Sequence, residues 1–296
     1  MAAEKTLVVV FGEVLFDCFP DGEEVLGGAP FNVAWNLQAF GDEPVFVSRI
    51  GNDPRGQKIV SEMRQWEMNL SQLQVDATHP TGQVEVALLG GEPHYTITTD
   101  CAYDFIDYHE IKPMPEERIV YHGTLGLRNR VARHALVELT SSFGSSIFVD
   151  VNLRDPWWKE EEVFYWLDSA RWVKLNVDEL RRLGFQNENL EQAMKEFQDR
   201  FDLEQVILTC GADGAMVVDD EGKLYQVQPG PVSDLVDTVG AGDAFTSVYL
   251  HGLVQDWPIQ KTLESAHKFA SQVIGLRGAT TNDKDFYDTI LNTFKE

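Results

Sequence analysis

Residues 237–245, DTVGAGDAF, place two carboxylates around a Gly-Ala-Gly turn. A glycine turn that opens a helix presents unpaired backbone N–H groups and the positive end of the helix dipole, which together suit an anion such as a phosphate. No lysine follows this turn, as one would in a P-loop. Asp243 falls in the first turn of the expected helix. Its carboxylate either caps that helix or acts as a base toward a substrate hydroxyl.

These residues need a scaffold that brings strand ends and helix starts together. Short apolar, β-branched segments alternate with helical patterns, which predicts a mostly parallel sheet with helices on both faces. Such sheets bind ligands beyond the carboxyl ends of their strands. The expected strands are TLVVVFG, PVFVSRI, RIVYHG, SIFVDV, RWVKLN, QVILTC and GAMVVDD. The expected helices are 30–40, 54–66, 129–141, 178–183, 190–201, 241–254 and 259–276.

Two segments interrupt the alternation, Val14–Leu26 and Thr81–Ile97. Both read as short alternating strands with turn residues and without helical partners, so we expect a small extra sheet that acts as a lid. The alternative is that they extend the edge of the main sheet. No repeat or linker divides the chain, so we expect one domain over 1–296, with lid segments at approximately 13–28 and 80–105.

Composition excludes several classes of protein. The net charge of −24 repels nucleic acid and anionic membranes. No apolar run approaches the roughly 20 residues that span a bilayer, and the N-terminus lacks the basic start of a signal peptide. Cys18, Cys101 and Cys210 have no paired spacing, and neither CxxC nor HExxH occurs. These features favour a cytoplasmic protein without a disulfide framework or structural zinc.

Longer motifs carry a family resemblance. The run GGAPFNVAWNLQAFGDEPVFVSRIG begins at Gly27, and together with DTVGAGDAF it resembles the two signatures of the ribokinase-like sugar kinases, the PfkB family. DVNLRDPWW, KLNVDE and ILTCGADGA follow in the family's order, so the resemblance covers nearly the whole chain. It implies a three-layer α/β/α sandwich with a mostly parallel central sheet and a small β-sheet lid. It also implies transfer of the γ-phosphoryl group of ATP to a sugar hydroxyl.

The resemblance gives the opening motif its roles. Asp243 becomes the general base that removes the hydroxyl proton, and Gly240, Ala241 and Gly242 form an anion hole for the phosphoryl group. Phosphoryl transfer depends mainly on positioning and on neutralising charge, which backbone N–H groups can do. The helix terminus and a metal would then take the place of the absent lysine.

The implied sugar-binding residues come from two motifs. Asp17, Gly28 and Asn32 supply acceptors and donors for a polyol, although Asp17 alone reads as a turn residue and Asn32 as a capping or buried amide. Asn152 and Arg154 follow a buried strand and should emerge at its carboxyl end. Arg154 can hold oxygen atoms bidentately, or it pairs with the aspartate that follows it. Three further residues lie in or after the lid, where they either cap the sugar or serve packing: Tyr95, Tyr103 and Asp104.

Nucleotide and metal contacts are implied by the remaining motifs. Glu179 matches the family's metal-binding glutamate and would hold Mg²⁺ through water, whereas by itself it reads as a solvated helix residue. In the family, the position of Asp237 lies near a monovalent cation, so the resemblance also implies activation by K⁺. The implied ATP contacts are Asn176, Thr209, Gly211, Gly214, His267 and Gly278.

The sequence indicates the identity of the acceptor sugar less specifically than it indicates the reaction. GGAPFNVAWNLQAFG and DVNLRDPWW are most similar to the fructokinase branch, which implies fructose as acceptor and fructose 6-phosphate as product. Ribose, 2-keto-3-deoxygluconate or a non-catalytic sugar-binding role are the alternatives, and no GxGxxG follows the first strand as a dinucleotide oxidoreductase would require. Where relatives carry a small Ala-Gly pair, this chain has Thr246, Ser247 and Val248, from which we expect altered packing. An exposed lid could also pair two subunits.

Overall fold

The computed structural model describes residues 6–89, 92–141, 144–228, 240–276 and 278–294. Within them, nine strands form one sheet in the order β13-β12-β11-β10-β9-β8-β1-β4-β5. All neighbours are parallel except β11–β12 and β12–β13. The strands are β1 Leu7–Phe11, β4 Val45–Gly51, β5 Leu73–Asp76, β8 Arg118–His122, β9 Ser145–Asp150, β10 Trp172–Asn176, β11 Gln205–Thr209, β12 Ala215–Val218 and β13 Leu224–Val227.

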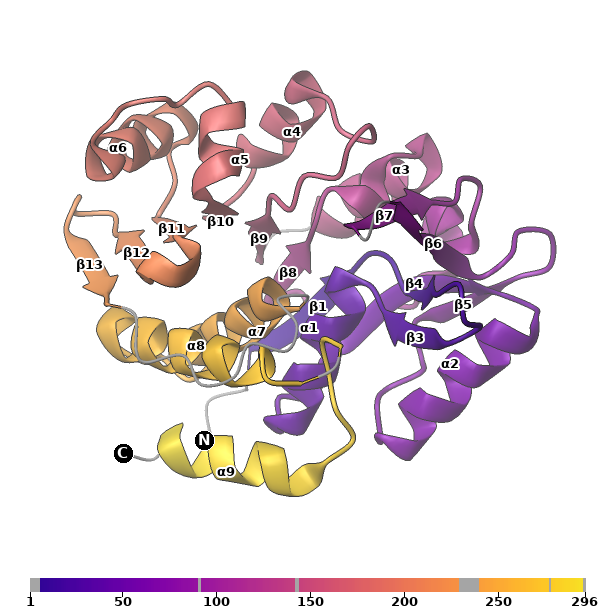
Figure 1. The fold of residues 1–296 in the computed structure, drawn as a ribbon. Helices are drawn as coiled ribbons and strands as arrows, with labels where there is room; N and C mark the ends of the chain where they lie inside the picture. The colour runs from indigo at the N-terminus through magenta and orange to yellow at the C-terminus, as the bar shows by residue number, and fades with distance from the viewer. Residues whose placement is uncertain (1–5, 90–91, 142–143, 229–239, 277, 295–296) are drawn as a thin grey trace.

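Helices cover both faces of this sheet, as expected for parallel strands that are apolar throughout. One core contains Val8 and Val10 of β1 and packs against α1 (Ala29–Ala39), α2 (Pro54–Gln65), α7 (Ala241–Val254), α8 (Ile259–Val273) and α9 (Lys284–Phe294). Val9 and Phe11 point to the opposite face, because successive side chains of a strand alternate. That face is covered by α3 (Arg130–Thr140), α4 (Glu160–Leu167), α5 (Val177–Arg182) and α6 (Leu190–Phe201). Figure 1 shows the resulting three layers.

A second sheet of four strands has the order β3-β2-β6-β7. Its strands are β2 Leu15–Cys18, β3 Glu24–Gly27, β6 Gly82–Leu89 and β7 Glu92–Ile97. The chain passes from the carboxyl end of β1 into β2 within three residues, so this sheet starts at the edge where ligands are expected. The lid segments thus form a separate sheet, and the alternative of an extended main-sheet edge is wrong.

The expected helices and strands are all present, with shifts of a few residues at their ends. The largest shift is in α8, which ends at Val273 rather than at residue 276. Sequence patterns did not indicate β5, β13, α4 and α9, which are short or lie at the periphery. Among the helices of the described residues, none is both long enough and apolar enough to cross a membrane.

Candidate functional site

The N-terminus of α7 is shaped for an anion. Gly240 is the N-cap, with φ 83° and ψ −7°, and no side chain caps the helix. A Cβ on Gly240 would lie 2.2 Å from the Cβ of Ala279, so both the conformation and the space require glycine. Gly242 is exposed in the first turn. The first backbone N–H groups of α7 are therefore open to a bound group.

Asp243 contacts α1, whose Asn32 is predicted to bind the sugar. Its Oδ2 accepts a hydrogen bond of 2.8 Å from Nδ2 of Asn32, which comes from α1. Burial raises the pKa of Asp243 to about 6, and the hydrogen bond from Asn32 opposes part of that rise. The recorded partner of the carboxylate is thus Asn32, and not the backbone of its own helix as a capping role would require. A carboxylate with a raised pKa is a stronger base than an exposed one.

The Gly27-Gly28 turn brings the other predicted sugar residues to the same place. A Cβ on Gly27 would lie 3.8 Å from both Oδ2 of Asp17 and Oδ1 of Asn32. Gly28 has φ 108° and packs so closely that a Cβ there would lie 2.8 Å from the carbonyl oxygen of Glu13. The turn therefore holds the Asp17 carboxylate and the Asn32 amide near each other, and Asn32 connects them to Asp243.

A lysine does approach the anion hole, although it comes from a distant strand. Nζ of Lys174 on β10 would lie 3.4 Å from a Cβ on Gly242. The same ammonium group lies 3.0 and 2.8 Å from the two carboxylate oxygens of Asp150 on β9. Burial lowers the pKa of Lys174, but Asp150 more than offsets this, so the pKa is raised and the group stays charged. The turn is not followed by a lysine in the sequence, but a lysine from β10 lies near it in the structure.

Thr246 also contacts Asp150, the buried partner of Lys174. Its Oγ1 lies 2.9 Å from Oδ2 of Asp150 and 2.9 Å from the carbonyl oxygen of Gly242. The hydroxyl thus fixes the Asp150 carboxylate against the first turn of α7. The sequence predicts altered packing from the residues after DAF, and Val248 lies in the core. Thr246 has a polar contact in addition, which ties the anion hole to β9.

Asn152 and Arg154 follow β9. Asn152 has φ 36°, an unusual conformation for a residue with a side chain. Arg154 is exposed, and its neighbour Asp155 bonds instead to Arg182 at 2.6 Å and to Nε1 of Trp158 at 2.8 Å. The alternative of an Arg154–Asp155 ion pair is therefore not what the structure contains. The charge of Arg154 acts on the Asp243 carboxylate and opposes the rise of its pKa that burial causes, so Arg154 lies near this carboxylate.

Glu179 is buried rather than solvated. Its Oε2 accepts from the backbone N–H of Asn176 and its Oε1 from that of Leu153, each at 2.9 Å. The Asn176 side chain accepts in turn from the backbone of Glu179, which makes a capping box for α5. Burial raises the pKa of Glu179, and the nearby Asp150 adds to this. Both oxygens are engaged, so this carboxylate fits a cation held through water.

The other predicted nucleotide residues lie at the carboxyl ends of β10 and β11 and beyond α7. Asn176 and Thr209 are register partners on these strands. Gly211 and Gly214 have φ 58° and 92° in the following turn. Gly278 has φ 87° and lies next to the lid, because a Cβ there would be 3.4 Å from Cγ1 of Val25. His267 is half-buried on α8, where burial lowers its pKa. Asp237 lies outside the described residues.

Both the sequence and the fold are similar to those of known carbohydrate kinases. Residues 5–285 match the model of the pfkB family of carbohydrate kinases. The chain belongs to this family. It is a phosphotransferase with a sugar as acceptor, and its fold is ribokinase-like.

Individual relatives share about a quarter of the sequence. Fructokinase-1 of Oryza sativa subsp. japonica is 29% identical over 92% of this kinase and 91% of its own length. The structure of fructokinase from Vibrio cholerae O395 with fructose, ADP and calcium ion bound superimposes with a TM-score of 0.81, at 26% identity over 97% and 99% of the two chains. Aminoimidazole riboside kinase from Salmonella enterica, complexed with aminoimidazole riboside and an ATP analog, gives 0.83, at 25% identity over 97% and 100%.

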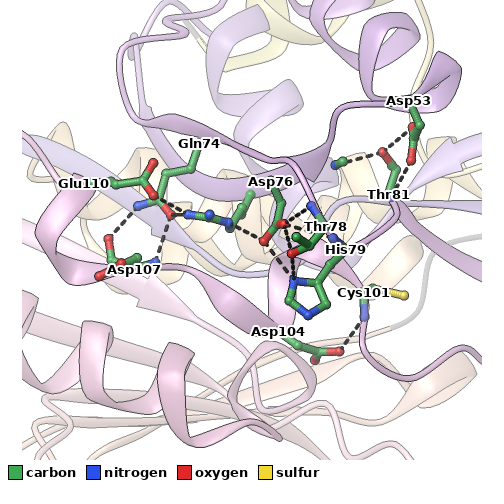
Figure 2. Close-up of polar contacts among 12 residues, drawn as sticks. Asp53, Gln74, Asp76, Thr78, His79, Thr81, Cys101, Asp104, Asp107 and Glu110 are labelled. Atoms are coloured by element: carbon green, nitrogen blue, oxygen red, sulfur yellow. Dashed lines mark hydrogen bonds and ion pairs between the residues drawn. The ribbon is translucent and has the colours of Figure 1, made fainter.

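Polar contacts connect the start of the lid in this kinase to the main domain. Asp53 accepts from the backbone and hydroxyl of Thr81 at 2.8 and 2.7 Å, where β6 begins. Asp76 accepts from the backbone N–H groups of Thr78 and His79 in the preceding turn, at 2.7 and 2.9 Å. Figure 2 shows the contacts of Asp53 with Thr81 and, separately, those of Asp76 with Thr78 and His79. The entry of the chain into the lid is therefore rigidly tied to the main sheet.

Tyr95, Tyr103 and Asp104, which lie in or after the lid, have different environments. Tyr95 is exposed, whereas Tyr103 is fully buried. Asp104 is buried as well and forms an ion pair of 2.7 Å with Arg128, from the loop before α3. Nothing in the local sequence marks Arg128 as a partner, since 24 residues separate the two.

Proposed function

We propose that this kinase transfers the γ-phosphoryl group of ATP to D-fructose, giving fructose 6-phosphate and ADP. The observation that carries the proposal is the Asn32–Asp243 hydrogen bond at the open N-terminus of α7. It puts a residue of the sugar motif in contact with the base, directly beside a site for an anion. A sugar hydroxyl and a phosphoryl group can thus meet there.

In the proposed reaction Asp243 accepts the proton of the attacking hydroxyl while the oxygen–phosphorus bond forms and the bond to ADP breaks. Asn32 and Asp17 hold the sugar, and Arg154 adds positive charge at the edge of the site. The N–H groups of the 240–242 turn bind the phosphoryl oxygens. The Lys174 ammonium lies close enough to this turn to stabilise their charge.

The nucleotide and its cations are assigned on the same basis. ATP would bind along the ends of β10 and β11, with contacts at Asn176, Thr209, Gly211, Gly214, His267 and Gly278. Glu179 would hold Mg²⁺ through water, and this ion supplies charge neutralisation between the phosphates when bound. Asp237 would lie near K⁺.

Fructose is favoured because the V. cholerae and rice relatives are fructokinases. The similarity to aminoimidazole riboside kinase is as high, so a riboside is the second candidate. Ribose and 2-keto-3-deoxygluconate remain to be compared with both.

ADP release with MgATP over a panel of these acceptors tests the proposal. We expect the highest kcat/KM with fructose, and ³¹P and ¹³C NMR should place the new phosphate on C6. A higher kcat/KM with a riboside or a sugar acid would contradict the fructose assignment, and ADP release that no acceptor stimulates would contradict the kinase mechanism.

We also propose a cytoplasmic homodimer. None of the three cysteines forms a disulfide, which supports a reducing compartment. The lid sheet ends in the outer strands β3 and β7, and an outer strand offers backbone groups to a second copy. Sedimentation of the wild type and of a variant with proline in β3, Val25→Pro, should show a dimer that the proline weakens.

A further inference from the structure

Glu13 is a buried carboxylate at the carboxyl end of the central strand β1. Its side chain is 3% exposed, and its Oε2 has no hydrogen-bond partner among the described residues. This oxygen lies close to the loop after β8, since a Cβ on Gly126 would be 3.1 Å away. Burying a carboxylate oxygen without a partner is costly, and buried polar groups in native proteins are nearly always bonded. Oε2 of Glu13 can therefore accept a hydrogen bond from a bound ligand.

Arg128 presents the complementary atom. Its Nε lies 2.7 Å from Oδ1 of Asp104, and its Nη2 lies 2.8 Å from Oδ2 of Asp104 and 2.6 Å from the carbonyl oxygen of Thr98. The guanidinium is flanked by the rings of Tyr103 and Trp157, with centroids 5.2 and 4.8 Å away. Its Nη1 is buried and has no partner within the described chain. The side chain is thus fixed in place while one charged donor is left over.

The two atoms belong to one region next to the base. The pKa of Glu13 is raised to about 7, chiefly by burial and also by the charge of Asp243, while Arg154 and Arg128 act to lower it. The hydroxyl of Tyr103 also lacks a partner among the described residues, and Glu13 and Arg128 both act on it through space. Gly28, beside Asp17 and Asn32, packs on the backbone of Glu13. Hydrogen-bonding atoms that have no partner among the described residues therefore lie close together, between the lid and Asp243.

We propose that Glu13 and Arg128 form a clamp for a hydroxyl group of the acceptor sugar, remote from the hydroxyl that is phosphorylated. A hydroxyl donates one hydrogen bond and accepts others, so it satisfies Oε2 of Glu13 and Nη1 of Arg128 together. A carboxylate or phosphoryl oxygen placed between the same two atoms accepts from Arg128 but leaves Glu13 without a donor. The clamp therefore selects a sugar that has a hydroxyl group, rather than an acid or phosphate group, at this position. This inference rests on the proposed kinase function and narrows its substrate class.

The test is a cycle between enzyme variants and deoxy sugars. The variants are Glu13→Gln and Arg128→Lys, and the acceptors are fructose and its monodeoxy analogues. For the wild type we expect one analogue to lose about 10- to 100-fold in kcat/KM, the range for a hydrogen bond to a charged group. The same analogue should lose at most a few-fold in Glu13→Gln, because the charge-assisted part of the hydrogen bond is already removed. The exposed Glu188→Gln is the matched control and should keep the wild-type penalty.

Binding gives a readout that does not depend on turnover. Fructose without nucleotide should raise the Tm of the wild type and of Glu188→Gln, and should raise that of Glu13→Gln much less. Equal penalties for every deoxy sugar in the wild type and in both clamp variants would overturn the clamp. A wild-type preference for a sugar with an acid or phosphate group in place of that hydroxyl would overturn it too. If a neutral sugar other than fructose is preferred, the fructose assignment falls, and the clamp stands when the cycle on that sugar's deoxy analogues shows the coupling.

Discussion

Asp243→Asn separates the role of the base from its role in folding. Asparagine has nearly the same shape, and its carbonyl oxygen can still accept from Nδ2 of Asn32, which lies 2.8 Å from the aspartate oxygen. Sugar binding should therefore change little, whereas the attacking hydroxyl loses its proton acceptor. We expect kcat to fall by about 10²- to 10⁴-fold, with KM for the sugar within a few-fold of the wild type.

The same substitution should stabilise the protein. The rise of the Asp243 pKa from 3.8 to about 6 corresponds to about 3 kcal/mol against the ionised form. Asp243 is only partly buried, so we expect a gain of about 1–2 kcal/mol at pH 8 after allowing for solvent screening. Above the folded pKa of about 6 the ionised group weakens the fold. Below 3.8 both the folded and unfolded states are protonated, and the gain should vanish.

Steady-state ADP release and urea unfolding at pH 4 and pH 8 measure both effects. The wild-type kcat should decline as the pH falls through about 6, because the base becomes protonated. Asp178→Asn is the control, since Asp178 is an exposed carboxylate in the first turn of α5. Near-normal kcat in Asp243→Asn would refute the assignment of the base. A loss of stability at pH 8 would refute the account of its raised pKa.

Three further substitutions test the surroundings of the base. Lys174→Met should lower kcat by about 10²-fold and destabilise the fold by about 3–5 kcal/mol, because Asp150 is left buried without its cation; an unchanged urea midpoint would contradict this. Gly240→Ala should abolish turnover and lower Tm well beyond Gly184→Ala, where φ is also positive but no atom lies within 4 Å of the new Cβ; equal Tm losses would show that crowding at Gly240 is unimportant. Arg154→Gln should lower kcat/KM by about 10-fold or more while leaving Tm unchanged, since the side chain is exposed; a loss of Tm instead would mark a structural role.

Patterns short enough to be read within one element predicted much of this fold. β-branched apolar runs mark the central strands because a strand buried on both faces needs apolar side chains at every position. The start of α7 at Ala241 follows from the glycine turn before it. The lid was predicted from alternating strands without helical partners. By contrast, β13 is only partly buried and pairs at the edge of the sheet, so its four residues carry a weak pattern.

The contacts that complete the site were not accessible in this way. Asn32 and Asp243 are 211 residues apart, and only the family resemblance placed both in one site. Lys174 was noticed as the first letter of a motif, but its position under the anion hole depends on the pairing of β9 and β10. Asp155 looked like the natural partner of Arg154 because it is adjacent, and it bonds to Arg182 instead.

The amino-acid sequence by itself determined the order of the elements, the glycine turn that we propose binds an anion and the presence of a carboxylate beside it, since each depends on neighbouring residues. Only the tertiary structure decided which charges act on that carboxylate, how far burial raises its pKa, and that Oε2 of Glu13 and Nη1 of Arg128 have no partner among the described residues. Burial and electrostatic interaction depend on distances between residues from different elements. These distances are set when the strands and the lid pack together, and no local pattern records them.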